Sequence, residues 1–280
     1  MKKLISILFP FLFACNPSEG VKKEHVQQDQ DSTEIVIPVT ETILDDPHQA
    51  IDQKIYPNGI EIVWFQKGKG AKITLGDVVD IDYKVRLRDS TIVDGNYLAK
   101  LKSIPFAVGY HMQTPGWDLA FQELSIGDFV RIKIPSKLGR GKKGFEDVIP
   151  ANADNYLTVR VLKKRIPSLS SGGTHMYLVH SDTFQGKRFN EKNFLLMHLL
   201  ASTQKNRYFT NSYEKNKPFG VQWKDKYMNE GLRKSLKNRK KGDHLLLIVA
   251  PQDAYGAKGL GQLVGPNETI FYDIQVLEVI

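Results

Sequence analysis

Hydrophobic and polar residues alternate along much of the chain after Gly59. Residues 77–87 follow this alternation closely, and residues 129–134 and 155–162 repeat it. A period of two predicts strands that bury one face and expose the other. We therefore expect an antiparallel sheet over this part of the chain.

One short helix is predicted after Pro115 in the same segment. Trp117, Phe121 and Leu124 recur at helical spacing, so their side chains share one face. A sheet with one apolar face needs a partner to cover it, and this helix is the available candidate. The pattern predicts the α+β class, with one helix packed on an antiparallel sheet.

The chain contains an internal repeat. A shift of 115 positions superposes residues 127–163 on 242–278 without a gap. Gly127 and Asp128 recur in this way as Gly242 and Asp243. Two copies of one fold are expected, and residues 238–241 look like a four-residue insertion in the second copy.

The N-terminus has the pattern of a signal peptide in residues 1–15. Two lysines precede an apolar run from Leu4 to Ala14 that is too short to span a bilayer as a helix. The run ends at Cys15, the single cysteine of the chain, which argues against disulfides and a cysteine-based metal site. The run resembles a bacterial lipobox, so we expect lipid on Cys15 to anchor the protein to a membrane.

The remaining chain divides by composition. Residues 16–58 carry three Lys or Arg against nine Asp or Glu, and we interpret them as a flexible acidic tether. The folded copies are expected at 59–165 and 174–280, with a Pro, Ser and Gly-rich linker at 166–173. The net charge of +8 is spread over both copies, which favours a solvated surface over a phosphate-binding face and predicts no nucleic-acid partner.

Residues 59–165 resemble the FKBP family of peptidyl-prolyl cis/trans isomerases over a whole domain. The matching pieces occur in the family's order. They are Gly76-Asp77 leading to Tyr83, Val93-Asp94, Pro115-Gly116-Trp117, residues 134–139 and residues 148–153. The resemblance implies two tandem domains, each with an antiparallel half-barrel sheet wrapped around one short helix.

The resemblance also implies a proline-binding pocket in the first copy. Trp117 would form its floor, and the residues with the main expected roles are Tyr83, Asp94, Trp117 and Ile149. Further substrate-binding positions would be Val93, Ile104, Phe106, Gln113, Thr114, Arg140, Phe145 and Leu157. The alternative for Ile104, Phe106 and Leu157 is that they are ordinary core residues.

Proline isomerisation fits a sequence without a catalytic triad, a metal cluster or a phosphate loop, and it needs no cofactor. The barrier to peptide-bond rotation is ~18–20 kcal/mol, and an apolar pocket that binds the twisted amide best lowers it. Two departures from the family pattern stand at the expected pocket. Arg140 replaces a ligand-binding tyrosine, while Gln113 and Thr114 replace an aliphatic pair.

The second copy resembles the family less closely. Tyr255 restores the tyrosine missing from the first copy, but Leu199 and Thr210 replace the strand tyrosine and the acid. Met228 is expected at the tryptophan position. The expected second-domain pocket comprises Phe209, Met228, Tyr255, Val264 and Tyr272.

Three functions remain open at this point. The first is a proline isomerase that acts on proline-containing segments of exported proteins. The second is a non-catalytic chaperone or peptide-binding lipoprotein, and the third is a purely structural surface lipoprotein. All three place the protein beyond the inner membrane, with outer-membrane anchoring and a periplasmic or surface-facing orientation expected.

Overall fold

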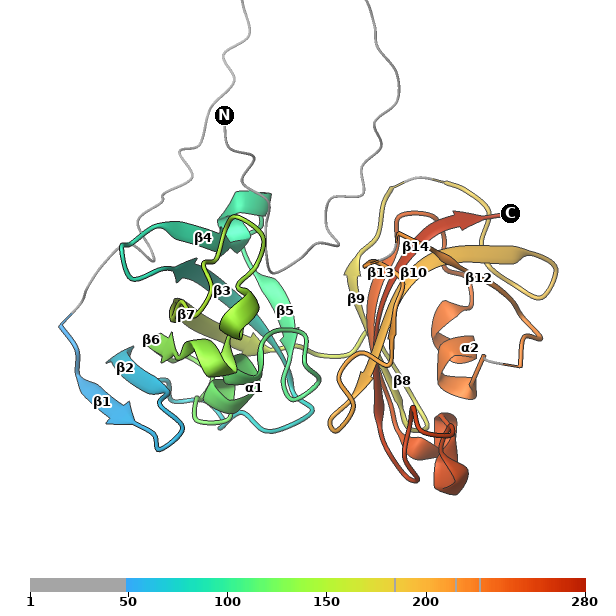
Figure 1. The fold of residues 1–280 in the computed structure, drawn as a ribbon. Helices are drawn as coiled ribbons and strands as arrows, with labels where there is room; N and C mark the ends of the chain where they lie inside the picture. The colour runs from blue at the N-terminus through green and yellow to red at the C-terminus, as the bar shows by residue number, and fades with distance from the viewer. Residues whose placement is uncertain (1–48, 184, 215, 227) are drawn as a thin grey trace, which may run out of the picture.

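The structure, a computed structural model, describes residues 49–183, 185–214, 216–226 and 228–280. The expected signal peptide with Cys15, and most of the expected tether, lie outside the described residues. Within them, the chain forms two antiparallel sheets, and each packs against one short α-helix (Figure 1). The predicted α+β class and the two copies of one fold are confirmed.

The first sheet joins strands from distant parts of the sequence. Its order is β1 (Asp52–Ile55), β2 (Glu61–Gln66), β6 (Phe129–Ile134), β7 (Asn155–Lys164), β3 (Val78–Arg86) and β4 (Ile92–Gly95), and β5 (Ile104–Ala107) also pairs with β3. In β6, Val130 and Ile132 are buried, whereas Arg131 between them is exposed. The alternation seen in the sequence therefore separates the core face from the outer face.

Helix α1 (Pro115–Phe121) covers the core face of this sheet. Thr114 precedes it in an extended conformation, and proline at the first helical position has the backbone angle that a helix needs. A Cβ on Gly116 would lie only 2.3 Å from Cγ2 of Ile134, so glycine permits the helix to approach β6 closely. Trp117 and Phe121 are buried against the sheet as expected.

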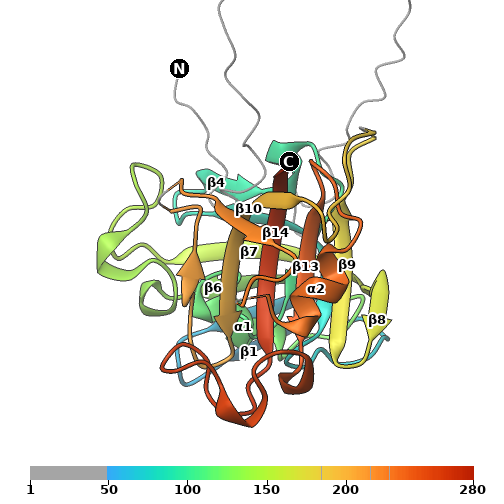
Figure 2. The same ribbon diagram turned by 90° about the vertical axis from the view of Figure 1, so that its right-hand side faces the viewer.

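The second sheet has the same strand arrangement (Figure 2). Its order is β11 (Thr210–Asn211), β10 (Phe194–Thr203), β14 (Ile270–Val279), β13 (His244–Val249), β9 (Thr174–His180) and β8 (Leu169–Ser171), and β12 (Phe219–Gln222) pairs with β10. Helix α2 (Glu230–Leu236) lies on the core face. Each strand thus has a counterpart in the first sheet.

The 115-residue shift holds from the helix onward. Gly127 and Gly242 both have positive φ angles, 95° and 86°. Gly231, the counterpart of Gly116, has the same close approach, because its Cβ would lie 2.3 Å from Cγ1 of Val249. The expected insertion at 238–241 is therefore wrong, since both helices precede the next strand by the same number of residues.

Two expected boundaries need correction. Residues 52–55, assigned to the tether, form β1 and pair with β2. Residues 169–171, assigned to the linker, form β8 and pair with β9. Every residue of β1 is exposed and β8 has no fully buried residue, so neither strand has the apolar alternation that marks the others.

The two domains share a third apolar cluster, formed where the first domain packs on the outer face of the second sheet. Its buried members are Val78, Ala107, Tyr110, Tyr177, Leu200, Leu246, Ile248 and Phe271. The rings of Tyr110 and Phe271 stack with centroids 5.5 Å apart. The hydroxyl of Ser202 donates a 2.7 Å hydrogen bond to the Tyr110 carbonyl. The second sheet is thus covered on both faces.

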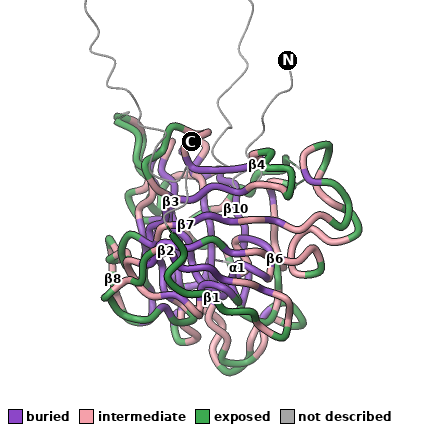
Figure 3. The backbone as a smooth tube through the Cα atoms, turned by 90° about the vertical axis from the view of Figure 1, so that its left-hand side faces the viewer, coloured by how far each residue is buried: buried purple, intermediate pink, exposed green. Residues whose placement is uncertain are grey.

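Burial follows the sheets closely. Buried residues run along the central strands, and exposed residues gather in the turns and at β1 and β8 (Figure 3). No helix in the described ranges is long and apolar enough to cross a membrane.

The stack between domains yields a stability prediction. Replacing Phe271 with Ala removes a fully buried ring from the domain interface. Buried Phe→Ala changes cost about 3–5 kcal/mol because apolar contacts are lost and a cavity is left. We expect this loss in the free energy of unfolding, measured by urea denaturation of the full chain.

Phe65→Ala is the matched control. Phe65 is a half-buried aromatic residue of β2, and its ring centroid lies 5.3 Å from that of Phe129. Its replacement should cost less than half as much as the loss of Phe271. Equal losses for the two variants would contradict a stabilising role for the domain interface.

Candidate functional site

Trp117 lies at the centre of an aromatic cluster in the first domain. Its side chain, 3% exposed, contacts Tyr83 edge to face at a centroid distance of 5.6 Å. Phe106 approaches it at 5.6 Å, and Phe121 stacks on it at 5.8 Å with an interplanar angle of 5°. The helix and strands β3 and β5 together hold these rings in place.

Tyr83 and Asp94 form a polar pair beside the aromatic cluster. The Tyr83 hydroxyl donates a 3.3 Å hydrogen bond to Oδ1 of Asp94, and the backbone N–H of Gly95 donates to the same oxygen at 2.7 Å. Burial and the neighbouring Asp94 carboxylate raise the pKa of Tyr83 well above its ordinary value. The hydroxyl therefore remains a hydrogen-bond donor at neutral pH.

The structure brings most of the predicted pocket residues together. One core cluster contains Tyr83, Val93, Ile104, Phe106, Trp117, Ile149 and Leu157, and Phe145 packs against it. Leu157 is completely buried, and Ile104 and Phe106 are as deeply buried as Trp117 and Tyr83. Phe145 is only half-buried and lies at the surface side of the cluster.

The loop before α1 forms one edge of the cluster. Gln113 and Thr114 are buried, and Oγ1 of Thr114 has no hydrogen-bond partner within the described structure. Asp118 fixes the loop, because its carboxylate accepts hydrogen bonds from the N–H groups of Gly109 at 2.7 Å and His111 at 3.0 Å. Burial raises the pKa of Asp118.

Arg140 lies beside Phe145, after the short helical turn Ser136–Leu138. Its guanidinium carbon lies 4.7 Å from the centroid of the Phe145 ring, a cation–π contact. Burial lowers the pKa of Arg140, but arginine remains charged in proteins. The position of the expected tyrosine is thus occupied by a half-buried cation.

The second domain has a different set of side chains at the equivalent positions. The helix register places Leu232, not Met228, at the position of Trp117, so the expected role of Met228 is wrong. Leu199 takes the place of Tyr83 and Thr210 that of Asp94, because they occupy matching registers in the sheet.

Met228, Val264 and Tyr272 belong to the second core, and Phe209 and Tyr255 pack against it. The Asn229 side chain donates to the Tyr272 hydroxyl at 2.8 Å and also caps α2 by accepting from the Leu232 N–H at 2.9 Å. Two side chains of the second pocket region are therefore hydrogen-bonded to each other.

The first-domain cluster suits binding of an apolar segment better than bond-breaking chemistry. It combines aromatic rings with the Asp94 carboxylate, and the raised pKa of Tyr83 makes its hydroxyl a poor nucleophile at neutral pH. In the described ranges no group of three or more His, Cys, Asp or Glu side chains could hold a metal ion.

A separate hollow lies on the outer face of the first sheet. Phe65, Phe129 and Tyr156 line it together with Arg86 and Arg131. It lies on the other side of the sheet from Trp117. Arg131 is exposed on the outer face of β6, whereas Val130 and Ile132 beside it face the core. We therefore place the candidate site at the aromatic cluster.

Sequence reasoning missed the contribution of the second domain to this site. Arg207 donates to the Gln113 carbonyl at 3.4 Å, and Tyr208 donates to the carbonyl of His111. The sequence of β13 carries a signal for the domain contact. Residues 245–249 are all apolar, and all six residues of the strand are buried. An uninterrupted apolar run is typical of a strand that is covered on both faces.

A family model described as FKBP-type peptidyl-prolyl cis-trans isomerase matches residues 69–162 and again residues 186–277. FK506-binding protein 2 of Kluyveromyces lactis is 40% identical over 84 residues, which are 30% of this chain and 59% of that protein. Peptidyl-prolyl cis-trans isomerase FKBP9 of Mus musculus is 23% identical over 231 residues, which are 82% of this chain and 38% of that protein. The chain thus spans less than two thirds of the length of either relative.

Solved structures with similarity include FkpA from Escherichia coli, with 26% identity and a TM-score of 0.38, covering 42% of this chain and 53% of that one. The three FKBP domains of wheat FKBP73 give 21% identity and a TM-score of 0.39, covering 80% of this chain and 96% of that one. The family model matches both copies and more than half of the chain. The chain therefore belongs to the FKBP-type peptidyl-prolyl cis-trans isomerase family.

Proposed function

We propose that this protein catalyses cis/trans isomerisation of peptide bonds before proline, and that the first domain carries the activity. The observation that carries the proposal is the cluster in which Trp117 lies against Tyr83, with Asp94 hydrogen-bonded to the tyrosine. The second domain lacks all three side chains at the equivalent positions.

To catalyse this reaction, the protein must lower the barrier to rotation about the peptide C–N bond. The reaction forms no covalent intermediate. Resonance gives the C–N bond partial double-bond character, and this creates the barrier of ~18–20 kcal/mol. An apolar surface such as that of Trp117 disfavours the charge-separated resonance form of the amide. Binding the twisted amide more tightly than either planar isomer then accelerates the interchange.

Polar groups at the edge of the cluster would orient the polypeptide. Asp94 and Tyr83 would accept and donate hydrogen bonds on one side, and the backbone N–H of Thr114 would hold a carbonyl next to the proline. The cluster is nearly closed at Trp117, so the substrate proline would enter beside the half-buried Phe145 and Arg140.

A second candidate function is peptide binding without catalysis, and the second domain favours it. Leu232 replaces the tryptophan floor, and Asn229 and Tyr272 bond to each other in the pocket region. We propose that this domain supports substrate recognition and does not catalyse isomerisation.

The cellular setting is also a proposal. Residues 1–15 have the pattern of a lipoprotein signal with Cys15 as the lipidated residue, and the following residues 16–48 are acidic on balance. We propose that the protein is exported, is held at a membrane by lipid on Cys15, and acts on proline-containing segments of exported proteins.

Trp117→Leu tests the proposed catalytic pocket. Leucine is the natural residue at the equivalent position 232, so it suits this fold, but it loses part of the indole surface. The lost contact of about 60–80 Å² corresponds to about 1.5–2 kcal/mol. We expect kcat/KM for short X-Pro peptides to fall at least about tenfold in a chain of residues 16–280.

Leu232→Met, at the matching position of the second domain, is the control and should leave this rate unchanged. Far-ultraviolet circular dichroism would verify that both variants are folded. A Trp117→Leu protein with the parent rate would remove the first pocket from consideration. If the parent chain accelerates no X-Pro peptide, the isomerase proposal fails and peptide binding becomes the better function.

Tyr83→Phe tests the polar pair. The change removes the hydroxyl that donates to Asp94 but keeps the ring against Trp117. A hydrogen bond of this kind contributes about 0.5–1.5 kcal/mol, so we expect kcat/KM to fall about two- to tenfold. Peptide isomerisation between pH 6 and 9 should show no step caused by Tyr83, because its raised pKa keeps it protonated there.

Tyr156→Phe removes a hydroxyl from the outer face of the same sheet and serves as the control. Its kcat/KM should match that of the parent chain. If the two variants behave alike, the Tyr83 hydroxyl does not take part in substrate orientation.

A further inference from the structure

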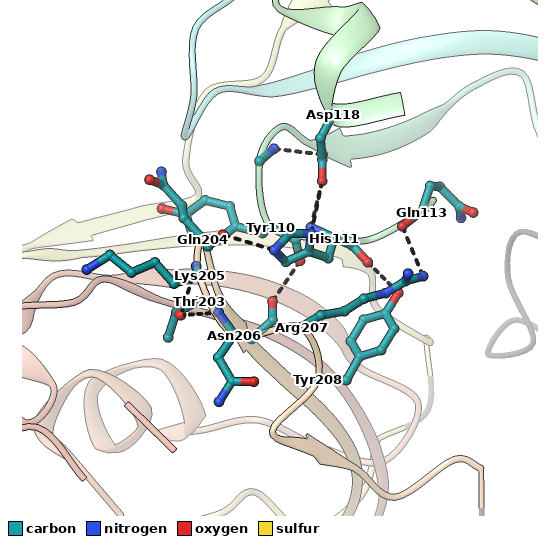
Figure 4. Close-up of polar contacts among 12 residues, drawn as sticks. Tyr110, His111, Gln113, Asp118, Thr203, Gln204, Lys205, Asn206, Arg207 and Tyr208 are labelled. Carbon is teal, nitrogen blue, oxygen red and sulfur yellow. Dashed lines mark hydrogen bonds and ion pairs between the residues drawn. The ribbon is translucent and has the colours of Figure 1, made fainter. Parts of the chain in front are cut away.

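A turn of the second domain lies against the loop that borders the first-domain pocket (Figure 4). This bridging turn, residues 203–208, connects β10 to β11. The Tyr208 hydroxyl donates to the carbonyl of His111, and Nη2 of Arg207 donates to the carbonyl of Gln113 at 3.4 Å. The His111 ring nitrogen Nε2 lies 3.0 Å from the carbonyl oxygen of Gln204.

The bridging turn is held firmly by its own hydrogen bonds. Oγ1 of Thr203 accepts from the N–H groups of Lys205 at 3.2 Å and Asn206 at 2.9 Å. The Asn206 side chain donates to the Leu263 carbonyl at 2.9 Å. Since Ser202 also bonds to the first domain, the turn has a fixed position at the pocket edge.

The Arg207 side chain is exposed and rests on the ring of Tyr208. Its guanidinium carbon lies 5.0 Å from the centroid of the Tyr208 ring, while the residue as a whole is exposed. A guanidinium has five N–H groups, more than Arg207 uses for the Gln113 carbonyl and the Tyr208 side chain, so donors remain for a ligand. Planar guanidinium groups pair with carboxylates through two parallel hydrogen bonds.

Arg140 supplies a second cation, beside Phe145 where the substrate is proposed to enter. Burial lowers the pKa of Arg140, and the charge of Arg207 contributes in the same direction. The anionic groups near them are Asp94, which favours the charged form of Arg140, and Asp118, which raises the pKa of Tyr208. A carboxylate placed between two guanidinium groups would relieve their repulsion.

We propose that Arg207, together with Arg140, makes this protein select polypeptides that carry an acidic residue next to the proline. Arg207 is then a specificity-determining residue that the second domain supplies to the pocket of the first. Tyr208 is a positioning residue, since it supports the Arg207 side chain and fixes the loop at His111. This inference rests on the proposed function.

The size of the effect follows from the exposure of Arg207. Exposed ion pairs contribute little free energy to binding. We therefore expect about a two- to fivefold preference for a glutamate peptide over its glutamine counterpart. Added salt should weaken the preference, because the Debye length falls from about 10 Å at 0.1 M to about 3 Å at 1 M.

The test compares matched peptides with a chain of residues 16–280. Peptides with Glu or Gln directly before the proline, and a second pair with Glu or Gln directly after it, are assayed for kcat/KM and for binding by calorimetry. The parent chain should favour one Glu peptide about two- to fivefold, mainly through KM. Arg207→Gln should abolish this ratio.

Lys205→Gln is the matched control, since it removes one positive charge from the same turn. The Lys205 side chain is 81% exposed and pairs with Glu268 at 3.1 Å, away from the pocket. The Glu to Gln ratio should survive in this variant. A ratio lost equally in both variants would show general attraction by positive charge and overturn the inference.

The outcomes separate the two proposals. Catalysis with no Glu preference overturns the inference and leaves the isomerase standing. Glu-selective binding that depends on Arg207, without catalysis of any peptide, supports the recognition site and overturns the isomerase. If the chain neither catalyses isomerisation nor binds the peptides, both proposals are overturned.

Discussion

The contact between the outer face of the second sheet and the edge of the first domain determines how this protein is arranged. β13 has six consecutive buried residues because Leu245 and Leu247 face the second core and Leu246 and Ile248 face the first domain. Such a sheet cannot be solvated on its outer face without exposing a large apolar surface. The two domains therefore form one continuous packed body rather than two modules on a flexible joint.

The pocket edge follows from this contact. The Tyr110 ring is stacked on Phe271, and Tyr110 is directly followed by His111 in the loop that leads to Gln113 and α1. Any shift of the second sheet would move the bridging turn away from this loop. Domain packing and pocket geometry are thus coupled through residues 110–113.

The two copies show how one backbone can carry different chemistry. Gly116 and Gly231 permit the same close approach of a helix to a strand, and the helices begin at matching positions. The side chains above them differ, because Trp117 is replaced by Leu232 and Asp94 by Thr210. Backbone constraints are shared by both copies, whereas the aromatic floor and the acid occur only in the first.

Much of the fold was predictable because it depends on local patterns. The alternation in β6 and the helical spacing of Trp117 and Phe121 each report burial directly, and the structure confirms the sheet and the helix. β1 and β8 could not be predicted in the same way. They lie at sheet edges with little or no burial, so backbone pairing holds them and leaves almost no mark on side-chain type.

The candidate site was predictable only in part. Family resemblance pointed to Trp117, Tyr83 and Asp94, and in the structure Tyr83 contacts both of the others. The position of Leu232 was missed because a supposed insertion shifted the helix by four residues. No local pattern could reveal Arg207, since its place beside Gln113 results from packing between segments almost a hundred residues apart.

Arg140 becomes easier to understand once the second domain is included. In an isolated domain, a half-buried arginine at the mouth of an apolar pocket would interfere with binding of an apolar segment, because a buried cation needs a compensating partner. Here Tyr208 of the second domain and Asp94 of the first favour the charged form of Arg140, whereas the charge of Arg207 disfavours it. The departure from the family pattern at Arg140 and the docking of the second domain are best explained together, as two parts of one polar entrance to an apolar site.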